Sequence, residues 1–201
     1  MTVATGAFEL YLRKTEPRKF EKYVDYVNVM TYDFCGFDGA YTGHHTNLRH
    51  SPADRKSNRS AMNAVEEYIA FGIPARKLVL GCAFYGRGWE GGVEASGTGL
   101  FARVNKESSK AIVASYAQLV DSYIDKNGYS RCWDEDSLAP YLWNPVQQAF
   151  ITYDDVESVT AKCRYVRLKG LAGAMFWEYH GDKDNCLLNA ICQTLSSNEA
   201  H

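Results

Sequence analysis

Three short apolar runs dominate the hydrophobic pattern of the chain, at residues 24–32, 77–84 and 171–176. Each is rich in aliphatic side chains without strict alternation, which is typical of strands buried on both faces of a parallel sheet. Polar and aromatic side chains follow where each run ends. Because the carboxyl ends of parallel strands meet at one edge of a sheet, we expect these side chains to gather there. They are Tyr32, Asp33, Tyr85, Arg87, Trp177 and Glu178.

Helical spacing of apolar residues predicts the elements that connect these strands. One helical pattern, from about residue 57 to 71, lies between the first two runs. Strand, helix and strand with short links form a βαβ unit, which implies parallel strands. A second helix is expected from Asp154, with Glu157 completing a capping box, up to Gly170. Residues 2–4 predict a further short strand, and a last helix closes the chain.

The pattern changes between the second apolar run and the second helix. Residues 90–99 contain four glycines, and a helical pattern follows at residues 116–124. Short strand-like segments then predict antiparallel hairpins. We therefore expect an α/β fold whose main unit comprises residues 1–89 and 150–201, with a small α+β insertion domain at residues 90–149. The strand-like segments of the insertion are residues 129–133, 139–143 and 149–153.

Length, composition and charge exclude several classes of protein. A chain of 201 residues, 46% apolar and 23% charged, is typical of one globular domain with room for a small insertion. Its net charge of -2 gives no basic surface for nucleic acid or an anionic membrane. No run approaches the roughly 20 apolar residues of a membrane span. Residues 2–5 do not resemble a signal peptide. We expect neither nucleic acid nor a membrane as partner.

The cysteines and histidines do not predict a metal site. The six cysteines form no C-x-x-C pair and no zinc spacing, so we expect buried free thiols, with a disulfide among those outside the strands as the alternative. His44, His45 and His50 lie in a glycine-containing loop, but their spacing lacks a dependable ligand geometry. We expect a mobile loop at the rim of a cleft there, and no metal or cofactor.

Taken together, the strand ends resemble the family 18 glycoside hydrolases, which are the chitinase-type enzymes. Residues 30–33, 84–89 and 173–178 match, in order and spacing, the motifs of that family's sixth, seventh and eighth strands. Residues 2–4 align with its fifth strand. The resemblance extends from Thr2 to about residue 195. It implies a partial TIM (β/α)8 barrel, strands five to eight, with the chitinase insertion domain at residues 90–149.

The resemblance also implies a chemistry. Family members hydrolyse β-1,4-linked N-acetylglucosamine polymers with retention, and the substrate's own N-acetyl group attacks the anomeric carbon. Tyr32 and Asp33 match the catalytic positions that hold the acetamido group and stabilise its developing charge. Trp177 matches the floor of the sugar subsite. For Glu178 an ion pair with Arg87 is an equal alternative to substrate binding. The residues implied to bind substrate are Met30, Tyr85, Arg87, Trp177 and Glu178.

One departure from the family limits the expected activity. The family motif Asp-x-x-Asp-x-Asp-x-Glu, which supplies the general acid, does not occur in this sequence. General acid catalysis typically contributes about 10²–10⁴-fold. We therefore expect the isolated chain to hydrolyse little or nothing. The alternatives are a non-catalytic chitin-binding or structural fragment, and a member that acts on other glycans or on peptidoglycan.

The expected sheet also raises the question of partners. Four parallel strands leave unpaired edges at residues 2–4 and 171–176, which invites pairing with another chain. Two arrangements follow: a homodimer with two-fold symmetry, or a complementing amino-terminal barrel half. The small-molecule partner implied is chitin or an N-acetylglucosamine oligosaccharide. The cellular location stays open, although full-length relatives are usually secreted.

Overall fold

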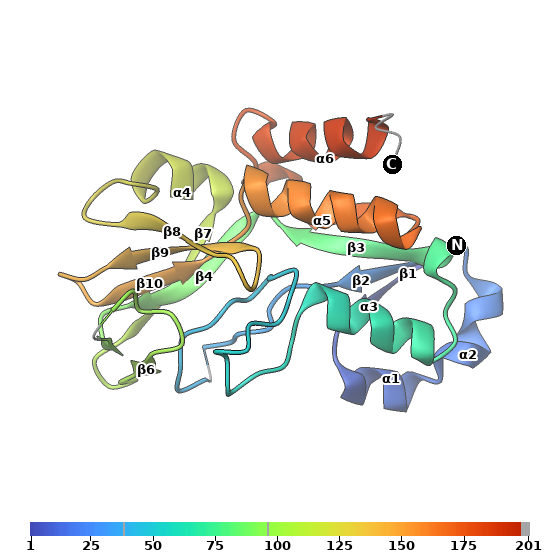
Figure 1. The fold of residues 1–201 in the computed structure, drawn as a ribbon, viewed down its shortest axis with the longest axis horizontal. Helices are drawn as coiled ribbons and strands as arrows, with labels where there is room; N and C mark the ends of the chain where they lie inside the picture. Colours follow the sequence, from blue (N-terminus) through green and yellow to red (C-terminus); the bar gives the residue numbers. More distant parts are fainter. Residues whose placement is uncertain (38, 96, 198–201) are drawn as a thin grey trace.

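The computed structural model describes residues 1–37, 39–95 and 97–197, and it places two sheets beside each other (Figure 1). The first sheet has four parallel strands in the order β1-β2-β3-β11. Its edges are therefore β1 and β11, as expected from the sequence. In the described part of the chain the strands form an open sheet and no closed barrel. The strands are β1 (Thr2–Gly6), β2 (Tyr26–Met30), β3 (Leu78–Ala83) and β11 (Gly173–Trp177).

Helices cover one face of this parallel sheet. α3 (Ala61–Ala70) and α5 (Val156–Lys169) pack on it, and α6 (Cys186–Ser196) packs on α5 (Figure 1). Val27 and Leu80 point toward these helices and are fully buried. Successive side chains of a strand alternate between faces, so the neighbours of these residues lie on the opposite face. The half-buried or exposed residues there are Tyr26, Asn28, Met30, Val79, Met175 and Trp177.

Two short helices after β1 were not predicted in full. α1 (Glu9–Thr15) was missed because its sequence has no clear apolar stripe, and in the structure it buries only Leu12. α2 (Pro17–Phe20) begins with the proline that suggested a helix start. The remaining single turns are the 3₁₀ segments η1 (Glu21–Tyr23), η2 (Ala75–Lys77) and η3 (Tyr179–Gly181).

The second sheet is antiparallel and follows β3 after a single residue, Phe84. Its order is β7-β4-β10-β9-β8, and α4 (Tyr116–Ser122) connects β7 to β8. The sheet starts at Tyr85 and ends at Thr152, slightly beyond both expected limits of the insertion. The division of the chain at residues 90 and 149 stays a prediction. The strands are β4 (Tyr85–Glu90), β7 (Lys110–Ser115), β8 (Ser130–Asp134), β9 (Ala139–Asn144) and β10 (Ala149–Thr152), with a separate pair β5 (Val93–Glu94) and β6 (Arg103–Val104).

The start of α5 differs from the expectation. Asp155 is the N-cap, and its carboxylate accepts a hydrogen bond from the Ser158 backbone N–H while the Ser158 hydroxyl accepts one from the Asp155 N–H. The predicted capping box of Asp154 and Glu157 was therefore wrong by one residue. Asp154 instead points into the interior. Gly170 ends the helix in a left-handed conformation, as predicted.

The loop between β2 and α3 is packed inside the molecule. Residues 42–48 are all buried, so the expectation of a mobile loop at a cleft rim was wrong for them. Backbone hydrogen bonds hold this loop, among them Phe34 N–H to the His45 carbonyl and Thr42 N–H to the Ala102 carbonyl.

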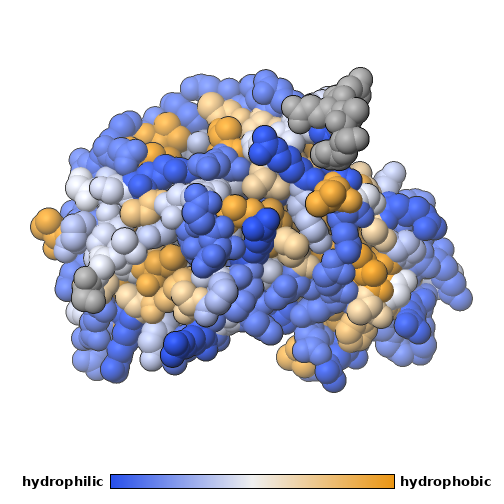
Figure 2. Space-filling view, in the orientation of Figure 1, coloured by the Kyte–Doolittle hydropathy of each residue, from blue (hydrophilic) through white to orange (hydrophobic). Residues whose placement is uncertain are grey.

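The surface and the thiols add two observations. Hydrophobic side chains appear as separate patches among hydrophilic ones on the face shown in Figure 2. Among the described residues, no helix has the length and apolar character needed to cross a bilayer. Cys82 and Cys163 are buried free thiols as expected, whereas the free thiols Cys186 and Cys192 are exposed.

Candidate functional site

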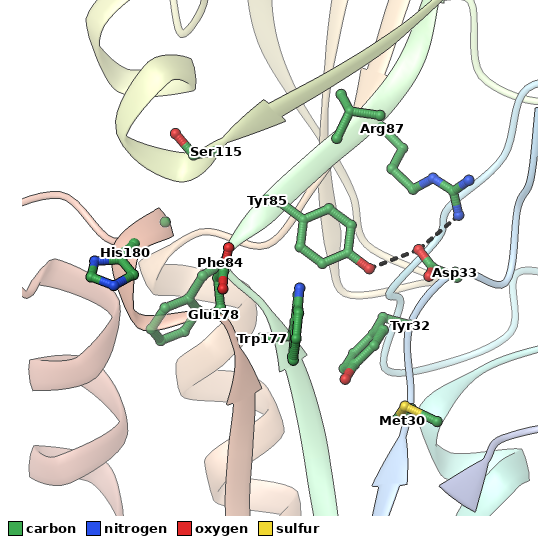
Figure 3. A pocket seen from close by; sticks show the side chains of 12 residues that line it. Met30, Tyr32, Asp33, Phe84, Tyr85, Arg87, Ser115, Trp177, Glu178 and His180 are labelled. Carbon is green, nitrogen blue, oxygen red and sulfur yellow. Dashed lines mark hydrogen bonds and ion pairs between the residues drawn. The ribbon is translucent and has the colours of Figure 1, made fainter. Parts of the chain in front are cut away.

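A cavity of about 620 Å³ lies at the carboxyl ends of β2, β3 and β11, and β4 and β7 wall one side of it (Figure 3). The structure brings all seven residues predicted for the site to this cavity. Their roles toward a substrate stay predictions. The seven are Met30, Tyr32, Asp33, Tyr85, Arg87, Trp177 and Glu178, and the other lining residues are Phe84, Val113, Ser115, His180 and Gly181.

Asp33 is the centre of the polar contacts in the cavity. The Tyr85 hydroxyl donates a hydrogen bond to Asp33 Oδ1 at 2.7 Å, and Arg87 Nη1 lies 2.7 Å from the same oxygen (Figure 3). The Arg87 guanidinium also covers the ring of Phe37 at 4.5 Å. No ion pair joins Arg87 to Glu178 within the described residues. The alternative in which these two pair is therefore wrong.

The surroundings of Asp33 favour its charged form. Burial raises the pKa of this carboxyl, but the approach of His45, the Tyr85 hydrogen bond and the Arg87 charge outweigh burial and hold the pKa well below its ordinary value. Burial and the Asp33 charge together raise the pKa of Tyr32 to about 12. At neutral pH the cavity thus presents a carboxylate beside a protonated phenol.

Two aromatic side chains give the cavity an apolar floor and mouth. Tyr32 is largely buried and meets the Tyr85 ring edge to face, with centroids 6.1 Å apart. A Cβ on Gly81 would come within 2.9 Å of the Tyr32 ring, so glycine leaves the space that this ring occupies. Trp177 is 59% exposed although it is large and apolar. An exposed indole in a cavity can stack on the apolar face of a ring-shaped ligand.

A buried ion pair supports the site from below. Lys162 Nζ lies 2.5 Å from Asp154 Oδ2, and the Thr46 hydroxyl bonds both groups. The Ala83 backbone N–H donates to the same Asp154 oxygen, which ties α5 to the end of β3. Lys162 was not among the residues predicted for the site, because in the sequence it lies within the apolar stripe of a helix.

Other cavity residues were missed by sequence reasoning. Val113 and Ser115 lie two apart on β7 and therefore face the same side of the strand, toward the cavity. His45, assigned to a rim loop, lies with its Nδ1 3.7 Å from Asp33 Oδ1. If β7 had been predicted as a strand, its periodicity of two would have placed Val113 and Ser115 on the same face. Within the described residues, no three His, Cys, Asp or Glu side chains form a group that could hold a metal ion.

Comparisons with known proteins identify the family of this chain. The family model of the glycosyl hydrolases family 18 matches residues 1–182. Chitinase A1 of Niallia circulans is 39% identical over 201 residues, covering 95% of this chain and 29% of that protein. Chitinase 1 of Aphanocladium album is 30% identical over 204 residues, covering 100% of this chain and 46% of that protein.

Solved structures show the same relationship in three dimensions. A glycoside hydrolase family 18 N-acetylglucosaminidase from Paenibacillus barengoltzii superimposes with a TM-score of 0.89 at 40% identity, covering 96% of this chain and 56% of that one. A mutant class V chitinase from Nicotiana tobaccum, solved in complex with NAG4, has a TM-score of 0.83 at 26% identity, covering 98% and 56%. The chain thus spans about half or less of the length of these relatives. It belongs to glycoside hydrolase family 18, with chitinase-like sequence and structure.

Proposed function

We propose that this chain is the sugar-binding half of a chitinase-like enzyme, and that its cavity holds an N-acetylglucosamine unit of a β-1,4-linked chain. The observation that carries this proposal is the convergence of Tyr32, Asp33 and Trp177 on one cavity. A volume of about 620 Å³ lies in the range of small-molecule sites. The chitinases among the relatives, one of them solved in complex with NAG4, support the choice of ligand.

In the proposed reaction the substrate's acetamido oxygen attacks the anomeric carbon, and the glycosidic bond breaks as its oxygen takes a proton. The positive charge that then spreads over the acetamido group needs a nearby anion. Asp33 suits that role because its surroundings keep it ionised. Tyr32, whose phenol stays protonated at neutral pH, can donate a hydrogen bond to the acetamido oxygen. Trp177 offers its ring face to the sugar.

We assign no residue of this chain as the acid that protonates the leaving oxygen. The acidic motif that supplies it in the family does not occur in the sequence. We therefore propose that the isolated chain binds N-acetylated oligosaccharides without cleaving them, which makes it a non-catalytic binding module on its own. Together with a chain that carries the acid, it would complete a retaining hydrolase.

The architecture supports a proposal about partners. We assign residues 1–89 and 150–201 to strands five to eight of a (β/α)8 barrel and residues 90–149 to an insertion domain that walls the cavity. The edge strands β1 and β11 have free backbone groups on their outer sides, and one face of the sheet lacks a covering helix among the described residues. A second copy, or an amino-terminal barrel half, would pair both edges at once.

Titration with N-acetylglucosamine oligosaccharides tests the function. Calorimetry is expected to show binding, and chromatography of the same mixtures is expected to show no shortened products. Glucosamine oligosaccharides of equal length are the control, since they lack the acetamido group that Asp33 would bind. Clear release of products would contradict the missing-acid argument. Equal binding of both sugars, or of neither, would contradict the assignment of the cavity.

Light scattering tests the partner. A mass of about twice that of one chain is expected if copies pair through β1 and β11. A charged residue placed on an edge, as in Ala4→Lys, should then shift the mass toward the monomer. A monomer that binds no dye specific for exposed apolar surface would contradict the dimer and leave the complementing half as the partner to test.

A further inference from the structure

His45 is a buried polar residue whose position beside Asp33 has no role in the proposal above. Its side chain is fully buried in the loop between β2 and α3. Both backbone polar groups of His45 form hydrogen bonds. Its N–H donates to the Thr152 hydroxyl at 3.2 Å, and its carbonyl accepts from the Phe34 N–H at 3.1 Å. The ring therefore has a fixed place behind the carboxylate.

The two ring nitrogens of His45 have no hydrogen-bond partner in the described part of the chain. Nδ1 lies 3.7 Å from Asp33 Oδ1, which is slightly too far for a hydrogen bond. The Tyr85 ring packs against the His45 ring, and the centroids of the two rings are 5.2 Å apart. Burial lowers the pKa of His45, against the opposing effects of Asp33 and Asp154, so the ring is neutral at neutral pH. A neutral imidazole carries a single N–H donor.

The contacts of Asp33 are unevenly divided between its two oxygens. Tyr85, Arg87 and the more distant His45 all approach Oδ1. No hydrogen bond or ion pair of the described residues reaches Oδ2. The carboxylate side chain is 46% exposed, and it lines the cavity. One oxygen is thus held by the protein, and the other is available to a donor from a ligand.

We propose that His45 is a positioning residue that carries its proton on Nδ1 and donates a hydrogen bond from this N–H to Asp33 Oδ1 when Oδ2 accepts the amide N–H of an N-acetylated sugar. This inference rests on the proposed function for its ligand. A donor on the ligand pulls the carboxylate into one orientation, and a donor behind it stabilises that orientation. Because His45 is neutral, it stabilises the carboxylate without cancelling the charge that faces the cavity.

The tautomer of His45 is the first test, and it needs no ligand. In protein labelled with ¹⁵N at histidine, the ring nitrogen shifts distinguish a proton on Nδ1 from a proton on Nε2. The Nδ1–H form is expected. The Nε2–H form would overturn the inference, since Nδ1 could not then donate a hydrogen bond to Asp33.

A matched pair of variants is the second test. The amide nitrogen of His45→Asn can take the place of Nδ1, whereas that of His45→Gln reaches the place of Nε2. We expect His45→Asn to keep affinity for the N-acetylated oligosaccharide within about threefold of wild type, and His45→Gln to lose about tenfold or more, as for a lost hydrogen bond to a charged group. Affinity for the matching glucosamine oligosaccharide should not distinguish the two.

The outcomes separate this inference from the function on which it rests. If wild type binds no N-acetylated sugar, the proposed function fails, and the tautomer alone decides the role of His45. If wild type binds but both variants bind equally well, the positioning role is overturned while the function stands. Urea unfolding shows whether both variants fold. If either variant does not fold, the tautomer of His45 in the wild-type protein alone tests the positioning role.

Discussion

Lys162 Nζ lies 2.5 Å from Asp154 Oδ2, and both side chains are fully buried. The pair joins α5 to the end of β3 through the Ala83 N–H, and to the loop of His45 through the Thr46 hydroxyl. A buried ion pair is not in itself strong evidence of net stabilisation, because removing two charges from water is costly. Its effect here is to fix the position of three segments that meet under the cavity.

Removing one partner of this pair should destabilise the protein strongly. Lys162→Met leaves the Asp154 carboxylate buried without a counter-charge, and we expect a loss of about 3–5 kcal/mol in the free energy of unfolding. Urea unfolding followed by circular dichroism measures it. The double variant Lys162→Met with Asp154→Leu removes both charges and should recover a large part of the loss. A single variant within about 1 kcal/mol of wild type would contradict this account.

The low pKa of Asp33 predicts a specific dependence of stability on pH. Burial opposes the shift, but His45, Tyr85 and Arg87 lower the folded-state pKa below the unfolded value of about 3.9. The resulting stabilisation is complete above the unfolded pKa and is lost as pH falls through the folded one. Wild type should therefore exceed Asp33→Asn in melting temperature at pH 7, and this difference should shrink below about pH 4.

The control for the pH experiment is Asp136→Asn. Asp136 is exposed in the turn between β8 and β9, and its side chain makes no ion pair within the described residues. Its melting curve should follow wild type from about pH 7 to about pH 2. A difference between wild type and Asp33→Asn that is constant over this range would show that the carboxylate gains no stabilisation from its neighbours.

The sequence predicted the parallel strands well because their signal is local. β2, β3 and β11 are runs of apolar residues, and the strand ends at Asp33, Tyr85 and Trp177 follow directly from where those runs stop. One strand of the second sheet was missed although its sequence is mostly apolar. β7 is only six residues long, buries only alternate residues, and follows a glycine-containing stretch that resembles a loop.

Contacts between distant residues could not be read from the sequence. Arg87 pairs with Asp33, far away along the chain, and not with Glu178, since the strand order decides which side chains meet. His45 is polar yet fully buried, and its environment comes from β10 and β4 as much as from its own loop. The placing of residues at the site was therefore predictable, whereas their pairing was not.

Gly88 should be essential to the close approach of β4 and β10 within the antiparallel sheet. It lies on β4 opposite Ile151 of β10, and a Cβ there would overlap the Phe150 carbonyl oxygen. Gly88→Ala must therefore push the strands apart, and we expect a loss of about 1–3 kcal/mol or more in the free energy of unfolding. Urea unfolding measures the change.

Gly97→Ala is the matched control for Gly88→Ala. A Cβ at Gly97 meets nothing within 4 Å, so its stability should stay within about 0.5 kcal/mol of wild type. If the two alanine variants unfold at the same urea concentration, close approach of the strands at Gly88 does not limit stability.

Trp177 should contribute to binding and little to folding. Its side chain is 59% exposed at the mouth of the cavity, so Trp177→Ala should change the free energy of unfolding by about 0.5 kcal/mol or less. The same variant should bind N-acetylglucosamine oligosaccharides about tenfold or more weakly, because a stacked aromatic face is lost. Calorimetric titration measures the affinity, and Trp177→Phe should keep part of it.

Tyr179→Ala is the control for a nearby aromatic ring. Tyr179 is 57% exposed, two residues further along the chain, and does not line the cavity. Its removal should leave the affinity unchanged, since only a ring at the cavity mouth can stack on a bound sugar. Equal losses in Tyr179→Ala and Trp177→Ala would place the sugar outside the cavity, on the surface after β11. Normal binding by Trp177→Ala would mean that the indole does not floor the sugar site.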